Sequence, residues 1–332
     1  MDMTRKTSVG IIGLGIIGSR VASSLRRSGF SVVVWNRSPR AEPNFLASAR
    51  EVAESADFLQ LFVRDGDALM EVIAAMSPVL GEHHIVMNHA TVSPAETVEA
   101  ERLVHERGAA FLDVPFTGSR DAAAEGQLVY YAGGDPSVLE RAMHVLEASA
   151  KAVLPMGPVG AATYVKVATN MISAATVEVL SEALAFLDRG GVSLLRLREA
   201  LEHNVASSGV ISAKLPLMLT GEFDPRFSVK NMLKDLQIAL RFAEGHGVEL
   251  PATAATAGAL MGAMQAGWGD DDFASLARHY PYSGSIKDLP VSEPFPSSSP
   301  APRKPNKRKK ASAKPARKSL LDYFRNSSES PS

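Results

Sequence analysis

Short runs of aliphatic and β-branched residues alternate with amphipathic stretches through the first half of the chain. Runs of this kind predict strands, and stretches with apolar positions three and four apart predict helices. The expected strands lie at 8–12, 31–35, 57–63, 85–87, 111–116, 128–132 and 151–156, and the clearest helices at 16–28 and 94–107. Alternating strands and helices are typical of βαβ units. We therefore expect residues 1–162 to form a Rossmann-like α/β domain with a mostly parallel sheet.

A long apolar segment without helix breakers follows at 163–189. Its apolar residues fall on nearly every side of a helix, which predicts a buried helix rather than a surface one. At 1.5 Å per residue this helix would run about 40 Å, long enough to link two domains and pack against a second subunit. Helices without intervening strands are then expected at 193–203, 207–219, 228–246 and 251–266, with a short last one at 270–276. The predicted layout is an interdomain helix at 163–192, an all-α domain at 193–285 and a tail at 286–332.

Composition and charge narrow the class of protein. Of 332 residues 45% are hydrophobic, which is ample for a core and excludes a wholly disordered or fibrous chain. The absence of cysteine excludes a disulfide scaffold, a thiol nucleophile and a Cys-ligated metal, and no metal site is predicted. No run reaches the roughly 18 apolar residues of a membrane helix. Glycines interrupt the apolar stretch near the N-terminus, so a signal peptide is not expected and the default location is the cytoplasm.

The net charge of −1 hides an uneven distribution. Residues 297–332 contain ten Lys and Arg against two Asp and Glu, a net +8, which leaves 25 bases and 34 acids, a net −9, for the remainder. A basic segment rich in Pro, Ser, Ala and Lys buries too little apolar surface to fold, so we expect disorder there. Its cluster Lys307-Arg308-Lys309-Lys310 is typical of nuclear import or phosphate contacts, or of solubilising charge. Arg317 to Phe324 resembles a sliding-clamp-binding peptide, with Arg317 in place of the usual Gln.

The sequence Gly13-Leu14-Gly15-Ile16-Ile17-Gly18 is a G-x-G-x-x-G motif. The motif alone is weak, but here it follows an expected strand and opens an expected helix, the context of a dinucleotide-binding site. The glycines permit a tight turn and let the backbone approach a pyrophosphate at the positive helix N-terminus. A glycine turn with a purely structural use is the alternative.

The end of the second expected strand indicates which dinucleotide is bound. An NAD site places Asp or Glu there for the ribose 2′-hydroxyl, whereas an NADP site places a cation for the 2′-phosphate. This chain reads Asn36-Arg37-Ser38, with no carboxylate. Because a guanidinium binds phosphate through two hydrogen bonds, Arg37 favours NADP over NAD. The alternative is that Arg37 is an ordinary surface cation.

Lys166 and Asn170 are candidates for the reacting centre. They are four residues apart on the predicted long helix and so lie on one face. That helix is otherwise apolar, and burial lowers the pKa of a lysine toward the range useful for acid–base catalysis. A lysine that extends its amine from a buried helix to water is the alternative.

Taken together, the motifs resemble the β-hydroxyacid dehydrogenases, a family that includes 3-hydroxyisobutyrate dehydrogenase and the glyoxylate/succinic semialdehyde reductases. The resemblance covers residues 8–285 in the family's order. Besides the glycine motif and Asn36-Arg37-Ser38, it rests on Asp113-Val114-Pro115-Phe116-Thr117-Gly118-Ser119, Gly126-Gln127-Leu128, the stretch from Gly157 to Asn170, Phe227 and Lys234-Asp235-Leu236.

The resemblance implies roles for individual residues. Lys166 would be the general acid in reduction and the base in oxidation, with Asn170 orienting substrate and lysine. Thr117, Gly118 and Ser119 would hold the substrate carboxylate. Thr91 would lie near the nicotinamide, and Lys234 would reach into the cleft from the helical domain as a second cofactor-binding residue. Phe227 and Asp235 would complete the substrate site.

The details point to one branch of the family. Ser119-Arg120 followed by Gly126-Gln127-Leu128 resembles the glyoxylate/succinic semialdehyde reductases more than 3-hydroxyisobutyrate dehydrogenase. Retention of Lys166 argues against the related imine reductases. Thr117 departs from the commoner Ser and adds a methyl group, and Thr169 replaces the first Asn of a usual pair. The expected activity is NADPH-dependent reduction of small carboxylate-bearing aldehydes by a homodimer or homotetramer. A 3-hydroxyisobutyrate-type dehydrogenase and a nucleic-acid-associated scaffold that uses the basic tail are the alternatives.

Overall fold

A computed structural model describes residues 7–280 and 282 of the chain. The N-terminal part contains one eight-stranded sheet, whose path runs β2-β1-β3-β4-β5-β7-β6, with β8 paired to β7. Neighbouring strands from β2 to β5 are parallel, as is the β7–β8 pair, whereas β7 is antiparallel to β5 and β6. The predicted mostly parallel sheet is therefore confirmed. The strands are β1 Ser8–Ile12, β2 Ser31–Trp35, β3 Phe58–Leu61, β4 Ile85–Asn88, β5 Ala110–Asp113, β6 Phe116–Thr117, β7 Leu128–Gly133 and β8 Ala150–Gly157.

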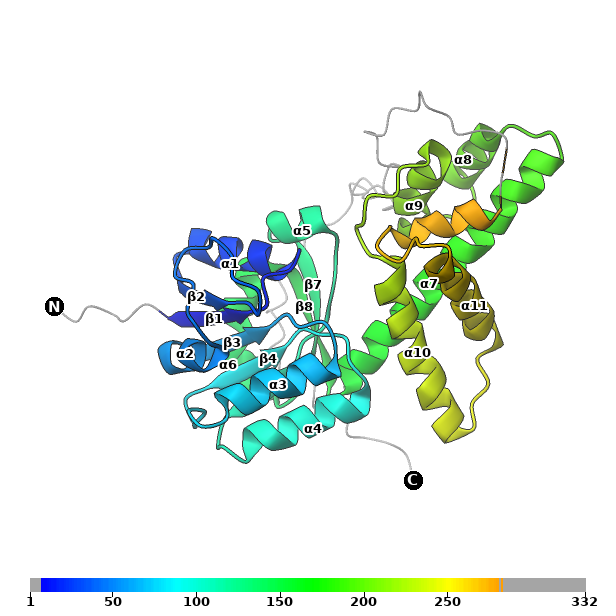
Figure 1. Cartoon of the computed structure of the whole chain (residues 1–332). Coiled ribbons are helices and arrows are strands. Elements are labelled where there is room, and N and C mark those ends of the chain that lie inside the picture. The colour runs from blue at the N-terminus through cyan, green and yellow to red at the C-terminus, as the bar shows by residue number, and fades with distance from the viewer. Residues whose placement is uncertain (1–6, 281, 283–332) are drawn as a thin grey trace, which may run out of the picture.

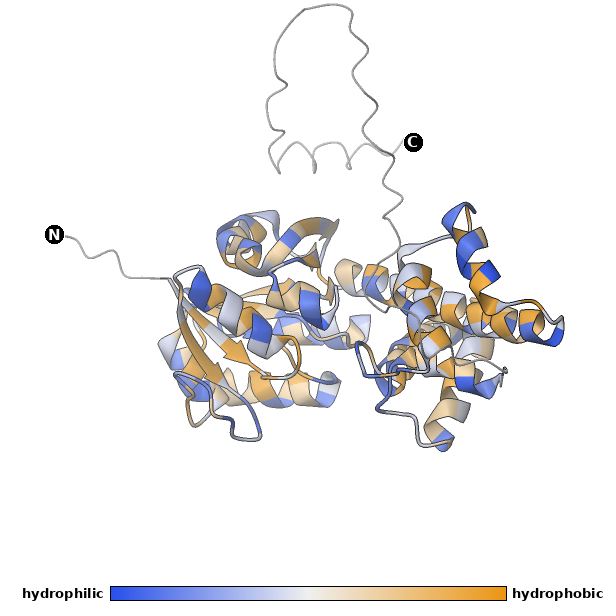
Figure 2. Ribbon diagram, turned by 90° about the horizontal axis from the view of Figure 1, so that it is seen from above, coloured by the Kyte–Doolittle hydropathy of each residue, from blue (hydrophilic) through white to orange (hydrophobic). Residues whose placement is uncertain are grey.

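Helices cover both faces of this sheet (Figure 1). One buried cluster joins Val9 and Ile11 of the sheet to α1 and α6. A second joins Ile12 and Leu59 to α2, α3 and α4. The apolar strands in Figure 2 thus lie between two helical layers, as expected for a parallel sheet buried on both faces. The helices are α1 Gly18–Arg27, α2 Ala49–Ser55, α3 Gly66–Met76, α4 Pro94–His105, α5 Arg120–Ala124 and α6 Pro136–Leu146, with a short 3₁₀ turn η1 at Glu147–Ser149.

The long helix α7, Ala161–Arg189, leaves the sheet domain and continues through a second, all-helical domain (Figure 1). A separate buried cluster forms around its C-terminal half and contains Ala174, Val177 and Leu184. The remaining elements of this domain are α8 Leu194–Glu202, α9 Gly209–Thr220, α10 Val229–His246, α11 Pro251–Gln265 and the 3₁₀ segment η2 Phe273–His279. The predicted all-α domain is confirmed, while the predicted tail at 286–332 lies outside the described residues.

Several elements differ from the sequence-based expectation. The helices α2, α3, α5 and α6 were not among the clearest predictions. Only α2 and α5 are short, with seven and five residues, whereas α3 and α6 have 11 residues each, close to the 12 of the predicted α4. The strand expected at 111–116 is two strands, β5 and β6, separated at Val114-Pro115. Proline has no amide hydrogen to donate to a ladder, which explains the interruption. The helix expected at 16–28 starts at Gly18, since residues 13–17 form the glycine turn.

The apolar character of α7 is only partly as expected. By length and composition α7 is apolar enough to cross a membrane, although polar residues such as Lys166 and Asn170 keep it from containing an unbroken run of about 18 apolar residues. Ala174, Val177 and Leu184 are fully buried. The expectation of burial on every side is wrong for the single chain, because Ile172, Val179 and Phe186 are exposed.

Asp113, at the end of β5, attaches α7 to the sheet. Its carboxylate accepts hydrogen bonds from the backbone amides of Gly160 and Thr163, at 3.2 and 2.9 Å, and from the Thr163 hydroxyl at 2.9 Å. Gly160 occupies the N-cap position with φ of 90°, a conformation suited to glycine, and offers no capping side chain of its own. Asp113 therefore supplies from another strand the cap that the helix lacks.

The charge state of Asp113 should make stability depend on pH. Burial raises the pKa of this carboxyl from 3.8 to about 6. At a pH between these two pKa values, Asp113 holds a proton in the folded chain but has lost it in the unfolded chain. The contribution of Asp113 to the free energy of unfolding therefore falls as the pH rises through this range. We expect the free energy of unfolding, relative to Asp113→Asn, to fall by up to about 3 kcal/mol between about pH 4 and pH 7. Urea unfolding across that range measures it, and parallel profiles for the two proteins would contradict the assignment.

Candidate active site

The glycine motif forms the turn between β1 and α1. Gly13 has φ of 99°, and a Cβ there would overlap the backbone oxygen of Phe62, so only glycine fits. A Cβ at Gly18 would likewise overlap the Gly13 oxygen. A Cβ on Gly15 would meet no atom within 4 Å, so this glycine faces open space. The helix has no side-chain cap and no acid in its first turn. The turn thus fits an anionic pyrophosphate placed against Gly15.

The end of β2 lies beside this turn. Asn36 accepts a hydrogen bond from the Leu14 amide at 2.9 Å and donates one to the Ser38 oxygen at 2.8 Å. Asn36 therefore fixes the glycine turn against β2, which sequence reasoning did not foresee. Arg37 and Ser38 are exposed, and Arg40 provides a second exposed cation close by in the chain. These residues fit a ribose that carries a phosphate. An NAD site has a carboxylate side chain at the end of β2, and this chain has Asn36 at that position.

Lys166 lies at the junction of the two domains, on the second turn of α7. It is 8% exposed, and its amine donates a hydrogen bond to Asn170 Oδ1 at 3.2 Å. The Asn170 amide donates in turn to Asp235 Oδ2 on α10 at 2.7 Å. Asp235 forms an ion pair with Lys234 at 2.8 Å, and the Lys234 amine also donates to the Thr91 backbone oxygen in the sheet domain. Five of the predicted site residues therefore form one connected network across the two domains.

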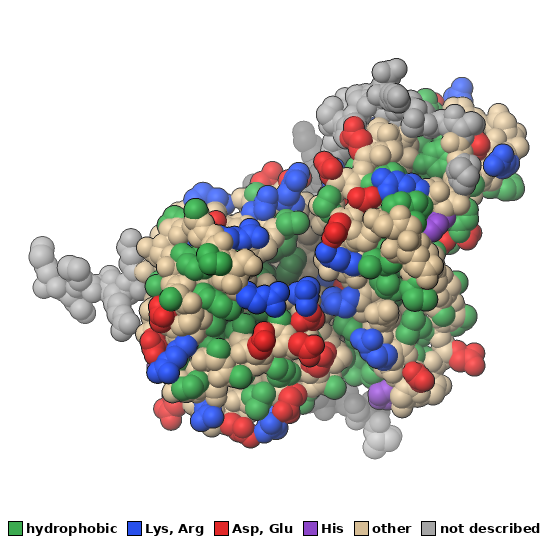
Figure 3. All heavy atoms as spheres, in the orientation of Figure 1, with side chains coloured by type: hydrophobic (Ala, Val, Ile, Leu, Met, Phe, Trp, Pro, Cys, Tyr) green, Lys and Arg blue, Asp and Glu red, His purple; other side chains and the backbone are tan. Residues whose placement is uncertain are grey.

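The environment of Lys166 favours its neutral form. Burial lowers the pKa of its amine, the charge of Asp235 opposes this effect, and the charge of Lys234 adds to it. A lysine in this state can take up and release protons closer to neutral pH than a solvated one. Lys and Arg side chains also gather along the boundary between the two domains in the space-filling view (Figure 3).

Phe227 is the aromatic neighbour of this network. The Lys166 amine lies 5.9 Å from its ring centroid, within the range of a cation–π contact. The Phe227 backbone is held by Asp272, whose Oδ2 accepts hydrogen bonds from the amides of Arg226 and Phe227 at 3.0 and 3.1 Å. Asp272 is fully buried and pairs with Lys214 at 2.7 Å. Sequence reasoning missed this buried pair, because its two members are 58 residues apart and match no motif.

The segment from Thr117 to Ser119 lies at the end of β6. Thr117 and Gly118 are exposed, and Gly118 has φ of 140°, which a side chain would strain. The Ser119 hydroxyl caps α5 by accepting the Ala122 amide at 3.1 Å, so its own hydrogen is still available to an anion. Within the described residues, no hydrogen bond or ion pair links this segment to the Lys166 network. The structure places this segment in the sheet domain. Its proximity to Lys166 in a common substrate site stays a prediction.

Asn88 is a positioning residue that the motifs did not single out, whereas Asp113 opens one of the family motifs but was given no role there. Asn88 closes a turn at the end of β4 through the amide and carbonyl of Ala90, at 3.0 and 3.3 Å. That turn presents the Thr91 oxygen to Lys234. The available signal was a polar residue directly after an apolar strand, which is where α/β sheets place their ligands.

Comparison with known families divides the chain at the start of α7. Residues 8–157 match the NAD binding domain of 6-phosphogluconate dehydrogenase. Residues 160–280 match the family described as NAD-binding of NADP-dependent 3-hydroxyisobutyrate dehydrogenase.

Three curated relatives cover most of the folded part of the chain. The chain is 32% identical to 2-hydroxy-3-oxopropionate reductase of Escherichia coli (strain K12) over 74% of its own length and 87% of that protein. It is 28% identical to glyoxylate/succinic semialdehyde reductase 1 of Arabidopsis thaliana, over 83% of this chain and 99% of that protein. It is 30% identical to cytokine-like nuclear factor N-PAC of Anopheles gambiae, over 80% of the chain but 49% of that longer protein.

The fold has a solved counterpart in Mycobacterium tuberculosis 3-hydroxyisobutyrate dehydrogenase, whose structure was determined with L-serine. The TM-score is 0.77 at 24% identity, over 83% of this chain and 99% of that one. At that identity the likeness concerns the fold.

The second and third glycines of the motif provide a matched test of the dinucleotide site. Gly15→Ala adds a methyl group in open space, so it should leave the melting temperature near that of the wild type while weakening dinucleotide binding by about 10-fold or more. Gly18→Ala should lower the melting temperature because its methyl overlaps backbone. Fluorescence titration with NADPH and thermal unfolding measure both. Unchanged affinity in Gly15→Ala would exclude the proposed pyrophosphate position.

Proposed function

The chain belongs to the β-hydroxyacid dehydrogenase family of NAD(P)-dependent oxidoreductases, and on that premise we propose that it reduces small aldehydes that carry a carboxylate. The observation that carries the proposal is the buried Lys166, held by Asn170 and Asp235 where the two domains meet. A bound dinucleotide supplies the two electrons as a hydride to the carbonyl carbon. Lys166 supplies the proton to the carbonyl oxygen, so aldehyde becomes alcohol and the lysine becomes neutral.

The residues around Lys166 prepare it for this step. Asn170 fixes the amine through the 3.2 Å hydrogen bond, and Asp235 fixes Asn170 from the opposite domain. Because Lys166 and Lys234 share one carboxylate, Asp235, the cluster has a net positive charge when both amines are protonated. Such a cluster favours an anionic substrate over a neutral aldehyde.

The substrate carboxylate is proposed to bind Thr117, Gly118 and Ser119. Backbone amides and the Ser119 hydroxyl hydrogen are donors suited to an anion. Phe227 would then close the apolar side of the substrate, with its ring directed by the Asp272 contacts to its backbone. The methyl group of Thr117 narrows this site and favours a short substrate.

The names of the relatives support a carboxylate-bearing aldehyde. One relative is named for 2-hydroxy-3-oxopropionate and another for glyoxylate and succinic semialdehyde. Glyoxylate and succinic semialdehyde are the substrates we propose. Oxidation of 3-hydroxyisobutyrate is the second candidate, which the match of residues 160–280 to the family described as NAD-binding of NADP-dependent 3-hydroxyisobutyrate dehydrogenase favours.

The finer points of the proposal concern cofactor, assembly and location. Arg37 and the missing carboxylate at the end of β2 support NADPH as the cofactor in preference to NADH. A homodimer or homotetramer in the cytoplasm is proposed. A nucleic-acid or sliding-clamp role rests on residues 297–332, which lie outside the described part of the chain, so no structural contact supports it.

A substrate panel with the full chain tests the function. Glyoxylate, succinic semialdehyde and 2-hydroxy-3-oxopropionate are assayed with NADPH and with NADH, and 3-hydroxyisobutyrate with NADP⁺ and NAD⁺. We expect the highest kcat/KM for one of the aldehydes with NADPH. Turnover of 3-hydroxyisobutyrate with NAD⁺, and of no aldehyde, would overturn the proposal.

The cofactor preference has its own test at Arg37. Arg37→Ala removes the cation proposed to bind the 2′-phosphate, so KM for NADPH should rise about 10-fold or more while KM for NADH stays within about twofold. Arg50→Ala is the matched control, because Arg50 pairs with Glu54 on α2. An equal change for both cofactors would mean that Arg37 does not read the 2′-phosphate.

The pH profile tests Lys166 and its neighbours. Reduction needs the protonated amine, so kcat/KM should fall as pH rises through the lowered Lys166 pKa. Asp235→Asn removes the charge that raises this pKa and should move the falling limb to lower pH; Lys234→Met removes a charge that lowers it and should move the limb to higher pH. Lys166→Ala should reduce kcat by about 10²- to 10⁴-fold. Shifts in the same direction for both neighbours, or a near-normal rate in Lys166→Ala, would contradict the assignment.

A further inference from the structure

A buried ion pair inside the helical domain has no part in the proton transfer described above. Lys214 on α9 and Asp272 at the N-cap of η2 are 6% and 0% exposed. The Lys214 amine donates to both oxygens of the Asp272 carboxylate, at 2.7 and 2.8 Å. Taking two charges out of water is costly, and apolar residues of similar volume often replace such a pair without loss of stability. Stability alone therefore does not account for this pair.

The Asp272 carboxylate joins three segments of the helical domain. Besides the amine, Oδ2 accepts the backbone amides of Arg226 and Phe227, at 3.0 and 3.1 Å, and Oδ1 accepts the amide of Ala274 at 3.0 Å. Of these donors only Lys214 carries a charge, and a charged donor makes the strongest hydrogen bond to a carboxylate. The ionised state of Asp272, and with it the segment before α10, therefore depends on Lys214.

The Phe227 ring is held by a second aromatic side chain that also contacts Lys214. The Phe273 amide donates to the Phe227 oxygen at 3.0 Å, and the two rings meet edge to face with centroids 6.3 Å apart. The Lys214 amine lies 4.3 Å from the Phe273 ring centroid. On its other side, Phe227 lies 5.9 Å from the Lys166 amine. Direct contacts thus lead from Lys214 through Phe227 to Lys166.

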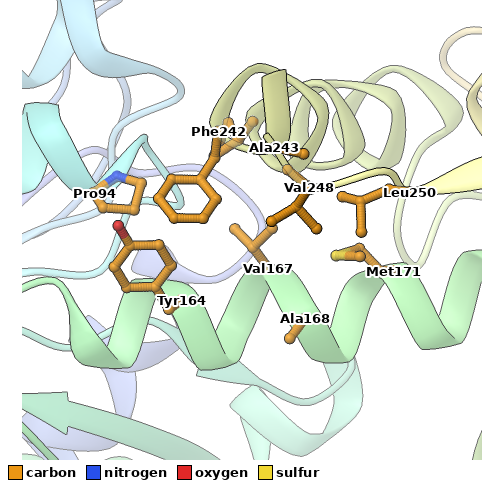
Figure 4. Close-up of a pocket in the computed structure, with 11 residues that line it drawn as sticks. Pro94, Tyr164, Val167, Ala168, Met171, Phe242, Ala243, Val248 and Leu250 are labelled. Atoms are coloured by element: carbon orange, nitrogen blue, oxygen red, sulfur yellow. The ribbon is translucent and has the colours of Figure 1, made fainter. Parts of the chain in front are cut away.

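Another side of α7 near Lys166 is less densely packed. An apolar pocket of about 270 Å³ lies between α7, α10 and the start of α4 (Figure 4), and Val167 and Met171 line it. These two residues directly follow Lys166 and Asn170 in the sequence. Apolar side chains that face such a space have no packing partners there within the described part of the chain. Phe227 does not line the pocket, so its contact with Lys166 lies where the packing is complete.

We propose that Lys214 and Asp272 are positioning residues that fix the Phe227 ring against the substrate and so determine how strongly the site prefers an aldehyde with methylene groups. This inference rests on the proposed function, in which Phe227 closes the apolar side of the substrate. Succinic semialdehyde has two methylene groups that can pack on the ring, whereas glyoxylate has none. A fixed ring therefore favours succinic semialdehyde, and a displaced ring loses that advantage.

Steady-state kinetics of the full chain test the proposal. Lys214→Met removes the charged donor, so kcat/KM for succinic semialdehyde should fall about 10-fold or more, mainly through KM, as for loss of a methylene contact. The loss for glyoxylate should be about fivefold smaller or less. Lys230→Met is the matched control and should change neither substrate, because Lys230 pairs with Asp270 at the surface of the same domain. Equal losses for both aldehydes would overturn the proposal.

A double-mutant cycle separates positioning from a general structural effect. Phe227→Ala removes the ring through which Lys214 is proposed to act, so Lys214→Met should change kcat/KM by less than about twofold in that background. Lys214→Gln keeps a neutral donor to Asp272 and should show the same pattern at smaller amplitude, which preserves the test where Lys214→Met does not fold. The same loss with and without the Phe227 ring would mean that Lys214 acts on stability alone.

Hydrogen exchange followed by mass spectrometry provides a readout that needs no substrate. In Lys214→Met or Lys214→Gln the amides of Arg226 and Phe227 should exchange about 10-fold faster or more, because their acceptor is no longer held in place. Lys230→Met should leave their exchange unchanged. Wild-type exchange rates at these amides in both Lys214 variants would overturn the proposal. Faster exchange in a chain that reduces no aldehyde would support the positioning of Phe227 and would refute the proposed function instead.

Discussion

Asp113 joins the end of β5 to the first turn of α7, and the positions of Lys166 and Asn170 follow from that contact. Two backbone amides and one hydroxyl of α7 donate to a carboxylate that belongs to the sheet. Because hydrogen-bond geometry is restrictive, the direction in which α7 leaves the sheet is fixed at its origin. Lys166 lies three residues after Thr163, and Asn170 lies one turn further along. The direction of α7 therefore determines where both side chains lie.

The second constraint is electrostatic and closes the gap between the domains. Lys234 reaches from α10 to the Thr91 oxygen, while Asp235 on the same helix holds Asn170. One short stretch of α10 therefore contacts the sheet domain and α7 together. Two amines lie near one carboxylate, and because Lys166 and Asp235 are buried, charge interactions there are stronger than at the surface. Under the proposed function, these three side chains govern both the protonation of Lys166 and the preference for an anionic substrate.

Much of the fold could be predicted from hydrophobic pattern alone, since strands such as Ser31–Trp35 and the unbroken segment of α7 carry strong signals. The order of strands, the break at Pro115 and the helices α2, α3, α5 and α6 required the structure. In the site, the glycine turn and the pair Lys166 and Asn170 followed from spacing, because both lie within one element. The link from Lys214 to Asp272, and from there to Phe227, joins segments distant in sequence. Contacts of that kind depend on how the elements pack, which local patterns do not encode.

The continuity of α7 has a mechanical consequence. Two domains joined by a flexible linker can open and close like a clamshell about a few residues. Here one unbroken helix of 29 residues belongs to both bodies, so a wide opening would have to bend the helix and disrupt its hydrogen-bond ladder. Movement around Lys166 is then expected to be local, in turns such as those at Thr91 and Gly118. A single helix shared by both domains would hold the two halves of the proposed site at a nearly fixed separation.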